Sequence, residues 1–185
     1  GRVRHLSQLT IHTFRRYLPL ATALLVTANA GVGKSRLRYE LLRALRGRPE
    51  PPEIWVARGD PITAGSAFGM LAQLIRGMAG LVEGELVEVR RLKLLARIGR
   101  HLPVDDAKRV AQFLGDLVRA EFPGDERPLL RAARQDPALM NDQLRSAFDE
   151  LVAAETAAGP LVIVLEDLQW GDLPSVQLLD RVLAS

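Results

Sequence analysis

A glycine-rich segment near the start of the chain contains the residue types that bind phosphate groups. Gly33, Lys34 and Ser35 match the end of the pattern G-x-x-x-x-G-K-[ST], whereas Ala28 replaces the glycine of its first position. Glycines let backbone N–H groups turn inward around an anion, and a helix that follows adds partial positive charge. The spacing predicts a loop that binds a nucleoside triphosphate. Its expected binding residues are Ala28, Asn29, Ala30, Gly31, Val32, Gly33, Lys34 and Ser35.

Two residues of this loop have specific expected roles. The Lys34 ammonium would reach the β and γ phosphates, and the Ser35 hydroxyl would be a ligand of Mg²⁺. If position 28 requires a positive φ, its alanine side chain costs about 1 kcal/mol or more. The alternative to a phosphate site is a glycine-rich turn that only joins a strand to a helix.

An acidic pair, Glu166 and Asp167, directly follows the apolar run Leu161–Leu165. Carboxylates at the end of a buried strand are costly without a partner, and in P-loop enzymes that partner is Mg²⁺ or the attacking water. Both residues are candidate catalytic residues. We assign Glu166 to Mg²⁺, directly or through water, and Asp167 to polarising the water, although the two roles could be exchanged. A helix-capping acid is the alternative.

The residues after the acidic pair have weaker signals. Asp172 is expected to cap the last helix, Trp170 to pack against other side chains, and Gln169 to contact the γ phosphate. The three histidines have no metal-ligand spacing, so we assign them no metal or catalytic role.

Composition limits the classes to which the protein can belong. The 185 residues include no cysteine, which excludes a disulfide framework and thiolate metal sites. The 25 basic and 22 acidic residues are interleaved, so the net charge of +3 does not favour a nucleic-acid partner. No apolar run approaches the roughly 20 residues that span a bilayer, and no leader opens the chain. We expect a soluble, cytoplasmic protein with no membrane partner.

Hydrophobic patterning predicts the elements that position these residues. Three short apolar runs are expected strands: Ala23–Thr27, Glu53–Arg58 and Leu161–Leu165. Helices are expected over Val3–Tyr17, Lys34–Leu45, Phe68–Met78, Glu85–Leu102, Asp106–Ala120 and Pro137–Ala158, and from Pro174 onward, with Asp105 and Asp136 as N-caps. This order predicts an α/β chain with a parallel sheet and a helical insertion between the second and third strands.

Several phrases of the sequence resemble a known family. "GVGKSRLRYELL" at residues 31–42 and "LVIVLEDLQWGDLPS" at residues 161–175 resemble the ATPase modules of bacterial signal-transduction ATPases with numerous domains. "RGDPITAGSAFGMLAQLIRGMAG" at residues 58–80 is similar to the version fused to serine/threonine protein kinases, and related modules occur in LuxR-type regulators. The family usually has glycine and glutamate at positions 28 and 29, and histidine at 169.

The resemblance implies an AAA-like P-loop ATPase with Walker A and Walker B motifs, which binds ATP and Mg²⁺. It implies one partial ATPase domain over residues 1–185. The expected parts are an opening helix (1–20), the P-loop strand, helix and second strand (21–66), a helical insertion (67–159), and the Walker B strand with its helix (160–185). The remaining C-terminal strands are expected beyond residue 185, which would leave the sheet incomplete.

The implied function is a slowly hydrolysing switch module of a larger bacterial signalling or regulatory protein. Expected partners are other domains of the same polypeptide, other proteins or a second copy, whereas a nucleic-acid partner is not expected. The chain lacks H-R-D and D-F-G segments, so any kinase activity would lie outside it. A degenerate ATPase that acts as a protein-interaction scaffold is the alternative.

Overall fold

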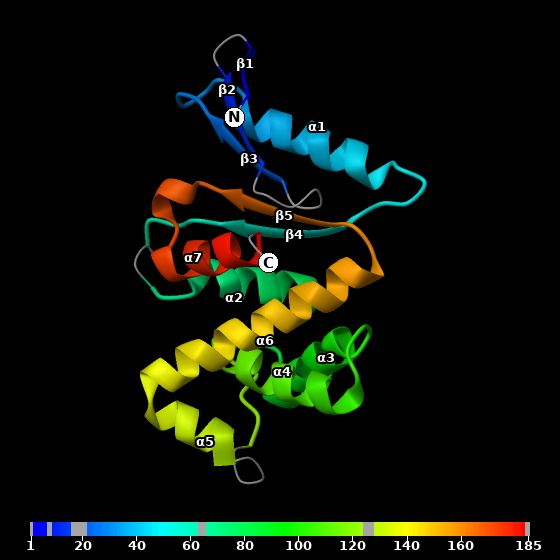
Figure 1. Ribbon diagram of the computed structural model, residues 1–185, viewed down its shortest axis with the longest axis vertical. Coiled ribbons are helices and arrows are strands. Elements are labelled where there is room, and N and C mark those ends of the chain that lie inside the picture. The colour runs from blue at the N-terminus through cyan, green and yellow to red at the C-terminus, as the bar shows by residue number, and fades with distance from the viewer. Residues whose placement is uncertain (1, 7–8, 16–21, 63–65, 124–127, 184–185) are drawn as a thin grey trace. The chain divides into compact units, whose positions relative to one another are not determined.

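The computed structural model describes residues 2–6, 9–15, 22–62, 66–123 and 128–183, which form two units (Figure 1). The first unit comprises residues 1–52 and 179–185, and the second comprises residues 53–178. No helix within the described ranges is both long and apolar enough to cross a membrane.

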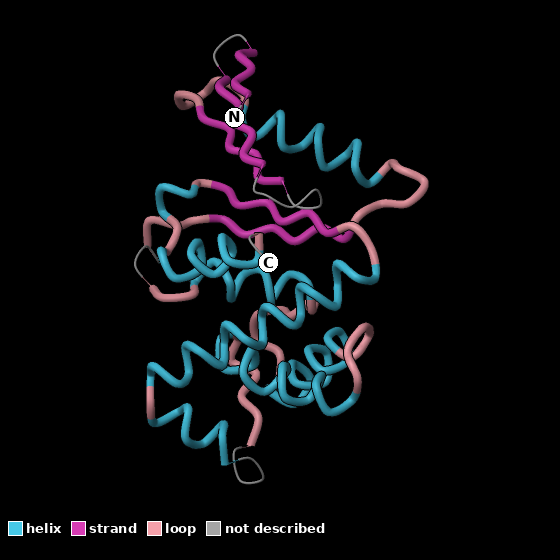
Figure 2. Tube along the Cα trace, viewed as in Figure 1, coloured by secondary structure: helices cyan, strands magenta, loops and turns pink. Residues whose placement is uncertain are grey.

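Within its described residues, the first unit begins with an antiparallel sheet that is followed by a helix. Its strands are β1 (Arg2–Leu6), β2 (Leu9–Arg15) and β3 (Thr22–Thr27), in the order β1-β2-β3, and they are magenta in Figure 2. The helix α1 (Lys34–Arg46) follows β3 and ends at Gly47. The predicted strand at Ala23–Thr27 and the helix from Lys34 are therefore confirmed.

The predicted opening helix is wrong, because two strands, β1 and β2, occupy Arg2–Leu6 and Leu9–Arg15. The β-branched residues Thr10, Ile11 and Thr13 prefer extended backbone, and this preference outweighs the loose helical spacing of the apolar residues. The parallel arrangement expected for the P-loop strand is also corrected. β3 pairs antiparallel with β2, the strand that directly precedes it in the sequence.

The second unit contains a parallel pair of strands, β4 (Glu53–Arg58) and β5 (Leu161–Glu166). They pair in register from Glu53 opposite Leu161 to Arg58 opposite Glu166. The predicted parallel arrangement is thus confirmed for the second and third strands, and the helical insertion lies between them in the sequence, as Figure 1 shows.

The insertion and the C-terminal segment are helical, and most of their helices were expected from the apolar spacing. Asp136 caps its helix as predicted, accepting hydrogen bonds from the N–H groups of Ala138 and Leu139. Asp105 lies instead in the first turn of a helix whose N-cap is Pro103, and one helix, α5, was not predicted. The bounds are α2 (Gly69–Met78), α3 (Val87–Ile98), α4 (Val104–Leu117), α5 (Pro128–Gln135), α6 (Pro137–Ala158), the 3-10 helix η1 (Leu168–Trp170) and α7 (Leu173–Val182).

The core of the second unit forms where helices cover one face of β4. Trp55 and Ala57 alternate with more exposed residues along β4 and are each 1% exposed, and α2 packs against this strand. The Trp55 ring lies 6.4 Å from the ring of Phe148 on α6, measured between centroids. This core holds the carboxyl ends of β4 and β5, where the predicted acidic pair lies.

Candidate functional site

The phosphate-loop candidate connects the end of β3 at Thr27 to the start of α1 at Lys34. Gly31 has a φ of 80° and Gly33 a φ of 100°, both in the left-handed region that favours glycine. A Cβ at either position would meet no heavy atom within 4 Å. The glycines are therefore required by the backbone path of the loop and not by lack of space.

The Lys34 side chain folds back onto the loop that precedes it. Its Nζ donates to the carbonyl oxygens of Ala28, at 2.7 Å, and Asn29, at 2.9 Å. The Lys34 ammonium would bind an anionic phosphate oxygen more strongly than these neutral carbonyl oxygens. The loop thus places an ammonium group next to its own turn, as a phosphate site requires.

The alanine at position 28 does not strain the loop. Among the described residues, the non-glycine positions with positive φ are Phe68, Arg119 and Asp167. Ala28 lies outside this set, so the cost of about 1 kcal/mol or more that was tied to a positive φ does not apply.

The start of α1 has the polarity that anions prefer. Its N-cap, Gly33, is left-handed, and among the described residues no side chain caps the helix and no acid lies in its first turn. Helix N-termini carry N–H groups without intrahelical partners and partial positive charge. The two glycines, the folded-back lysine and the uncapped helix therefore fit a phosphate chain.

The acidic pair lies in the second unit, at the carboxyl end of β5. Glu166 is the last residue of the strand, opposite Arg58 of β4, and it is half-buried. Asp167 follows with a φ of 49° and precedes η1. Its Oδ2 accepts a hydrogen bond from Nε of Arg58 at 2.7 Å, and this bond and the carboxylate charge raise the pKa of Arg58.

The turns after β4 and β5 lie in close contact. The Gly59 N–H donates to the carbonyl oxygen of Glu166 at 2.8 Å. A Cβ on Gly59 would lie 2.4 Å from the backbone oxygen of Asp167, which no real side chain tolerates. Glycine is therefore needed at position 59 so that the acidic turn can pack against the end of β4.

Sequence reasoning assigned no role to Arg58, although it contacts a predicted catalytic residue. One signal points to it: Arg58 ends the strand before a Gly-Asp-Pro turn, just as the acidic pair ends its own strand. Because the carboxyl ends of parallel strands meet at one edge of a sheet, charged residues at two such ends become neighbours.

Asp172 has the capping role that was predicted, and a second one. Its Oδ1 accepts a hydrogen bond from the N–H of Ser175, and through this bond Asp172 caps α7. The same oxygen also accepts from the N–H of Phe68. Its Oδ2 accepts from the N–H of Met70, in the first turn of α2. One carboxylate, 5% exposed, therefore caps two helices.

The other predicted residues near the acidic pair lie at the surface. Trp170 is 46% exposed, so it does not contribute to the core as a packing residue would. Gln169 is also exposed. Its expected contact with the γ phosphate stays a prediction.

The side chains proposed for Mg²⁺ have suitable chemistry. Among the described residues, no group of three or more histidine, aspartate or glutamate side chains forms a metal site by itself. Mg²⁺ that arrives with a nucleotide needs only one or two protein oxygens, because phosphates and waters supply the other ligands. The Ser35 hydroxyl and the Glu166 carboxylate are ligands of this type.

Comparison with known proteins gives one match. A family model described as "AAA ATPase domain" matches residues 1–185. No curated protein and no solved structure matches the chain.

Proposed function

The chain belongs to the AAA ATPase domain family, and we propose that it is the ATP-binding switch module of a larger bacterial signalling or regulatory protein. The observation that carries the proposal is the loop between β3 and α1. Its glycines adopt left-handed backbone, and its lysine folds back onto the turn. The family match adds nucleotide binding as the general activity of such domains.

In this proposal the loop from Ala28 to Ser35 holds the phosphates of ATP. Backbone N–H groups of the loop and of the first turn of α1 donate to phosphate oxygens. Lys34 leaves the carbonyl oxygens of Ala28 and Asn29 and binds the β and γ phosphates, because a charged acceptor gives the stronger hydrogen bond.

Slow hydrolysis is the second part of the proposal, in which Ser35 of the first unit and Glu166 of the second are each candidate Mg²⁺ ligands. When bound, the ion would supply positive charge that offsets the charge of the phosphates. Asp167 polarises the attacking water. Supporting this assignment, both acids lie at the carboxyl end of a parallel strand, Glu166 as its last residue and Asp167 just after it, where open α/β folds place their ligands.

The proposed partners of the module follow from its membership of the ATPase family. Nucleotide binding would shift a longer polypeptide between two states, so the expected partners are its other domains, other proteins or a second copy. Interleaved charges give no basic stripe that would indicate a nucleic-acid partner.

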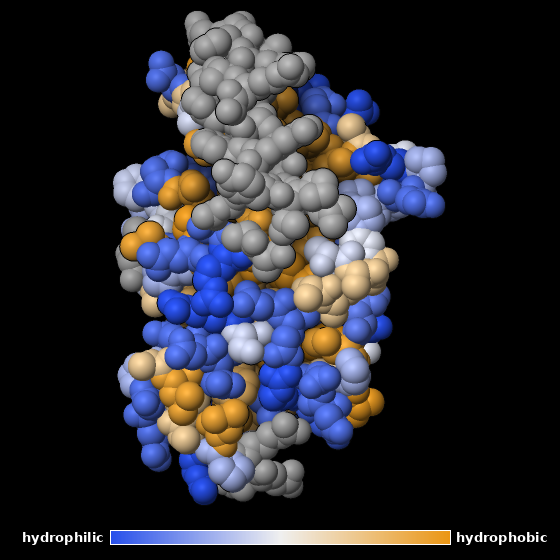
Figure 3. Space-filling view, viewed as in Figure 1, coloured by the Kyte–Doolittle hydropathy of each residue, from blue (hydrophilic) through white to orange (hydrophobic). Residues whose placement is uncertain are grey.

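A protein-interaction scaffold without nucleotide binding is the second candidate, and exposed apolar side chains favour it. The surface of the helical insertion is mixed, with orange hydrophobic areas among blue hydrophilic ones in Figure 3. The exposed apolar residues near α3 and α4 include Val82, Leu86, Leu92 and Val104, each at least 60% exposed. Surfaces of this kind occur at protein interfaces.

The test is ATP binding in the presence of Mg²⁺, measured by calorimetry on the parent chain and its Lys34→Ala variant. Losing a charge-assisted contact should raise the Kd of ATP about 10- to 100-fold. Arg43→Ala is a matched control, because Arg43 is a cation of the same helix that pairs with Glu40 and is 73% exposed. The control should bind ATP as the parent does.

The two candidate functions predict different results. A switch requires that the parent binds ATP and that Lys34→Ala binds it weakly. Equal ATP binding by the parent and Lys34→Ala would show that the loop is not where ATP binds. If neither protein bound ATP, the scaffold function would be favoured.

A further inference from the structure

Arg58 lies in a chain of contacts that runs from helix α2 to the acidic turn. The amide side chain of Gln73, on α2, holds both backbone polar groups of Arg58. Its Nε2 donates to the Arg58 carbonyl oxygen at 2.8 Å, and its Oε1 accepts from the Arg58 N–H at 3.0 Å. The last residue of β4 is therefore fixed from the helix side as well as by its own strand.

The Asp167 backbone is also fixed, in a conformation that residues other than glycine rarely adopt. Its φ of 49° lies in the left-handed region, and such backbone persists where the surroundings determine it. The surroundings here are the close approach of Gly59 to the Asp167 carbonyl and the hydrogen bond from the Trp170 N–H to that same carbonyl, at 2.8 Å.

The ion pair joins these two fixed points. Nε of Arg58 donates to Oδ2 of Asp167 at 2.7 Å, while the two side chains are 70% and 33% exposed. A pair this exposed contributes little to folding stability. Its main effect is on the carboxylate, because a hydrogen bond to Oδ2 fixes rotation about the Cβ–Cγ bond and so directs Oδ1.

We infer that Arg58 is a positioning residue for hydrolysis: it orients the Asp167 carboxylate, and Gln73 in turn holds Arg58. This inference rests on the proposed hydrolytic function. Arg58 acts through Asp167 and does not bind the nucleotide. Its removal should therefore lower kcat and leave KM unchanged. Without Arg58, the Asp167 carboxylate would rotate freely, and one of its oxygens would point at the water for a smaller fraction of the time.

The experiment measures kcat and KM for Mg²⁺–ATP in the parent, Arg58→Ala, Arg58→Lys, Asp167→Asn and the double variant Arg58→Ala/Asp167→Asn. Arg58→Ala should lower kcat about 10- to 100-fold, with KM within about twofold of the parent. Arg58→Lys should recover part of the loss, because lysine keeps the charge but not the planar guanidinium. In the Asp167→Asn background, Arg58→Ala should cause no further loss.

Arg134→Ala is the matched structural control. Arg134 makes two hydrogen bonds to Asp116 in the same unit, at 2.9 and 2.8 Å, so its removal also breaks an arginine–aspartate pair. It should leave kcat unchanged. Equal loss of kcat in the Arg134→Ala and Arg58→Ala variants would make the effect structural and overturn the inference.

The remaining outcomes separate this inference from the proposed function. An active parent whose kcat is unchanged or raised in Arg58→Ala overturns the role of Arg58 alone. So does a loss of kcat on Arg58→Ala that is equally large in the parent and in the Asp167→Asn background. A parent that binds ATP without any turnover overturns the proposed hydrolysis and this role together.

Discussion

At the scale of single residues, the phosphate loop tolerates substitution least at Gly33, because a Cβ atom added there would disfavour the backbone conformation that the loop adopts. A φ of 100° is unfavourable for alanine by about 1–2 kcal/mol, and no neighbouring atom adds to this cost. We therefore expect Gly33→Ala to lower both the free energy of unfolding and the affinity for ATP. Urea unfolding and calorimetric titration with Mg²⁺–ATP measure the two effects.

Gly77→Ala is the control for this prediction. Gly77 lies within α2, its φ is not positive, and a Cβ there meets nothing within 4 Å. Alanine should stabilise the chain by about 0.5–1 kcal/mol at this position, since glycine weakens helices. Equal effects of the two substitutions would show that Gly33 does not need its left-handed backbone.

Residues of the candidate site differ in how far the sequence alone could predict them. The phosphate loop is a local motif, so its glycines and Lys34 could be recognised within eight consecutive positions. The contact of Arg58 with Asp167 joins residues 109 positions apart. Only the parallel register of β4 and β5 brings them together, and no pattern near Arg58 specifies that register.

At the scale of elements, two helices share one cap, and this gives the second prediction. Asp172→Ala removes an acceptor from three buried N–H groups, those of Phe68, Met70 and Ser175. Each lost cap costs about 1 kcal/mol, and buried donors without partners cost more. We expect a loss of about 2–4 kcal/mol in the free energy of unfolding, measured with urea.

Asp136→Ala is the single-helix comparison. Asp136 accepts from two N–H groups at the start of α6 only, and its hydrogen bonds are exposed. Its loss should cost about 1 kcal/mol. If Asp172→Ala cost no more than this, the shared cap would have no special contribution to stability.

The elements themselves were predicted with uneven success, for physical reasons. α2 and α6 follow regular apolar spacing, and Asp136 with Pro137 marks the start of α6, so both were found. The segment of β1 and β2 also has apolar residues at helical spacing, but its β-branched residues favour strands. The second role of Asp172 depends on Phe68, 104 positions away, and is invisible to local patterns.

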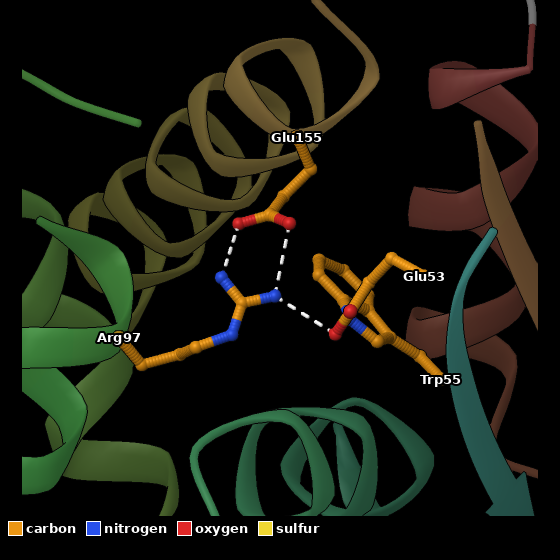
Figure 4. Close-up of polar contacts among 4 residues, drawn as sticks. All are labelled: Glu53, Trp55, Arg97 and Glu155. Atoms are coloured by element: carbon orange, nitrogen blue, oxygen red, sulfur yellow. Dashed lines mark hydrogen bonds and ion pairs between the residues drawn. The ribbon is translucent and has the colours of Figure 1, made fainter. Parts of the chain in front are cut away.

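At the scale of the whole molecule, a buried charge cluster joins distant segments of the second unit (Figure 4). Arg97 of α3 donates to both carboxylate oxygens of Glu155 on α6 and, at 2.9 Å, to Oε1 of Glu53 at the start of β4. The Arg97 and Glu155 side chains are 6% and 4% exposed. Hydrogen bonds from Arg97 to Glu155 and Glu53 raise the pKa of the arginine, so it stays charged.

Arg97 therefore links α3 and α6, through hydrogen bonds, to β4, the strand that ends at Arg58. The indole N–H of Trp55 also donates to Oε1 of Glu53, at 3.1 Å, which links the cluster to the core. Interleaved charges along the helices indicated solvated faces. They gave no sign that one arginine and one glutamate, 58 positions apart, would be buried together.

The last prediction concerns this cluster. Arg97→Met should lower the free energy of unfolding by about 3–5 kcal/mol, because Glu155 would be left as a buried charge without its main partner. Adding Glu155→Leu should restore about 2 kcal/mol or more, since a buried ion pair can be replaced by apolar residues of similar volume. Urea unfolding of both variants measures the difference. A double variant less stable than Arg97→Met would mean that the two side chains stabilise the unit through separate contacts and not through their pairing.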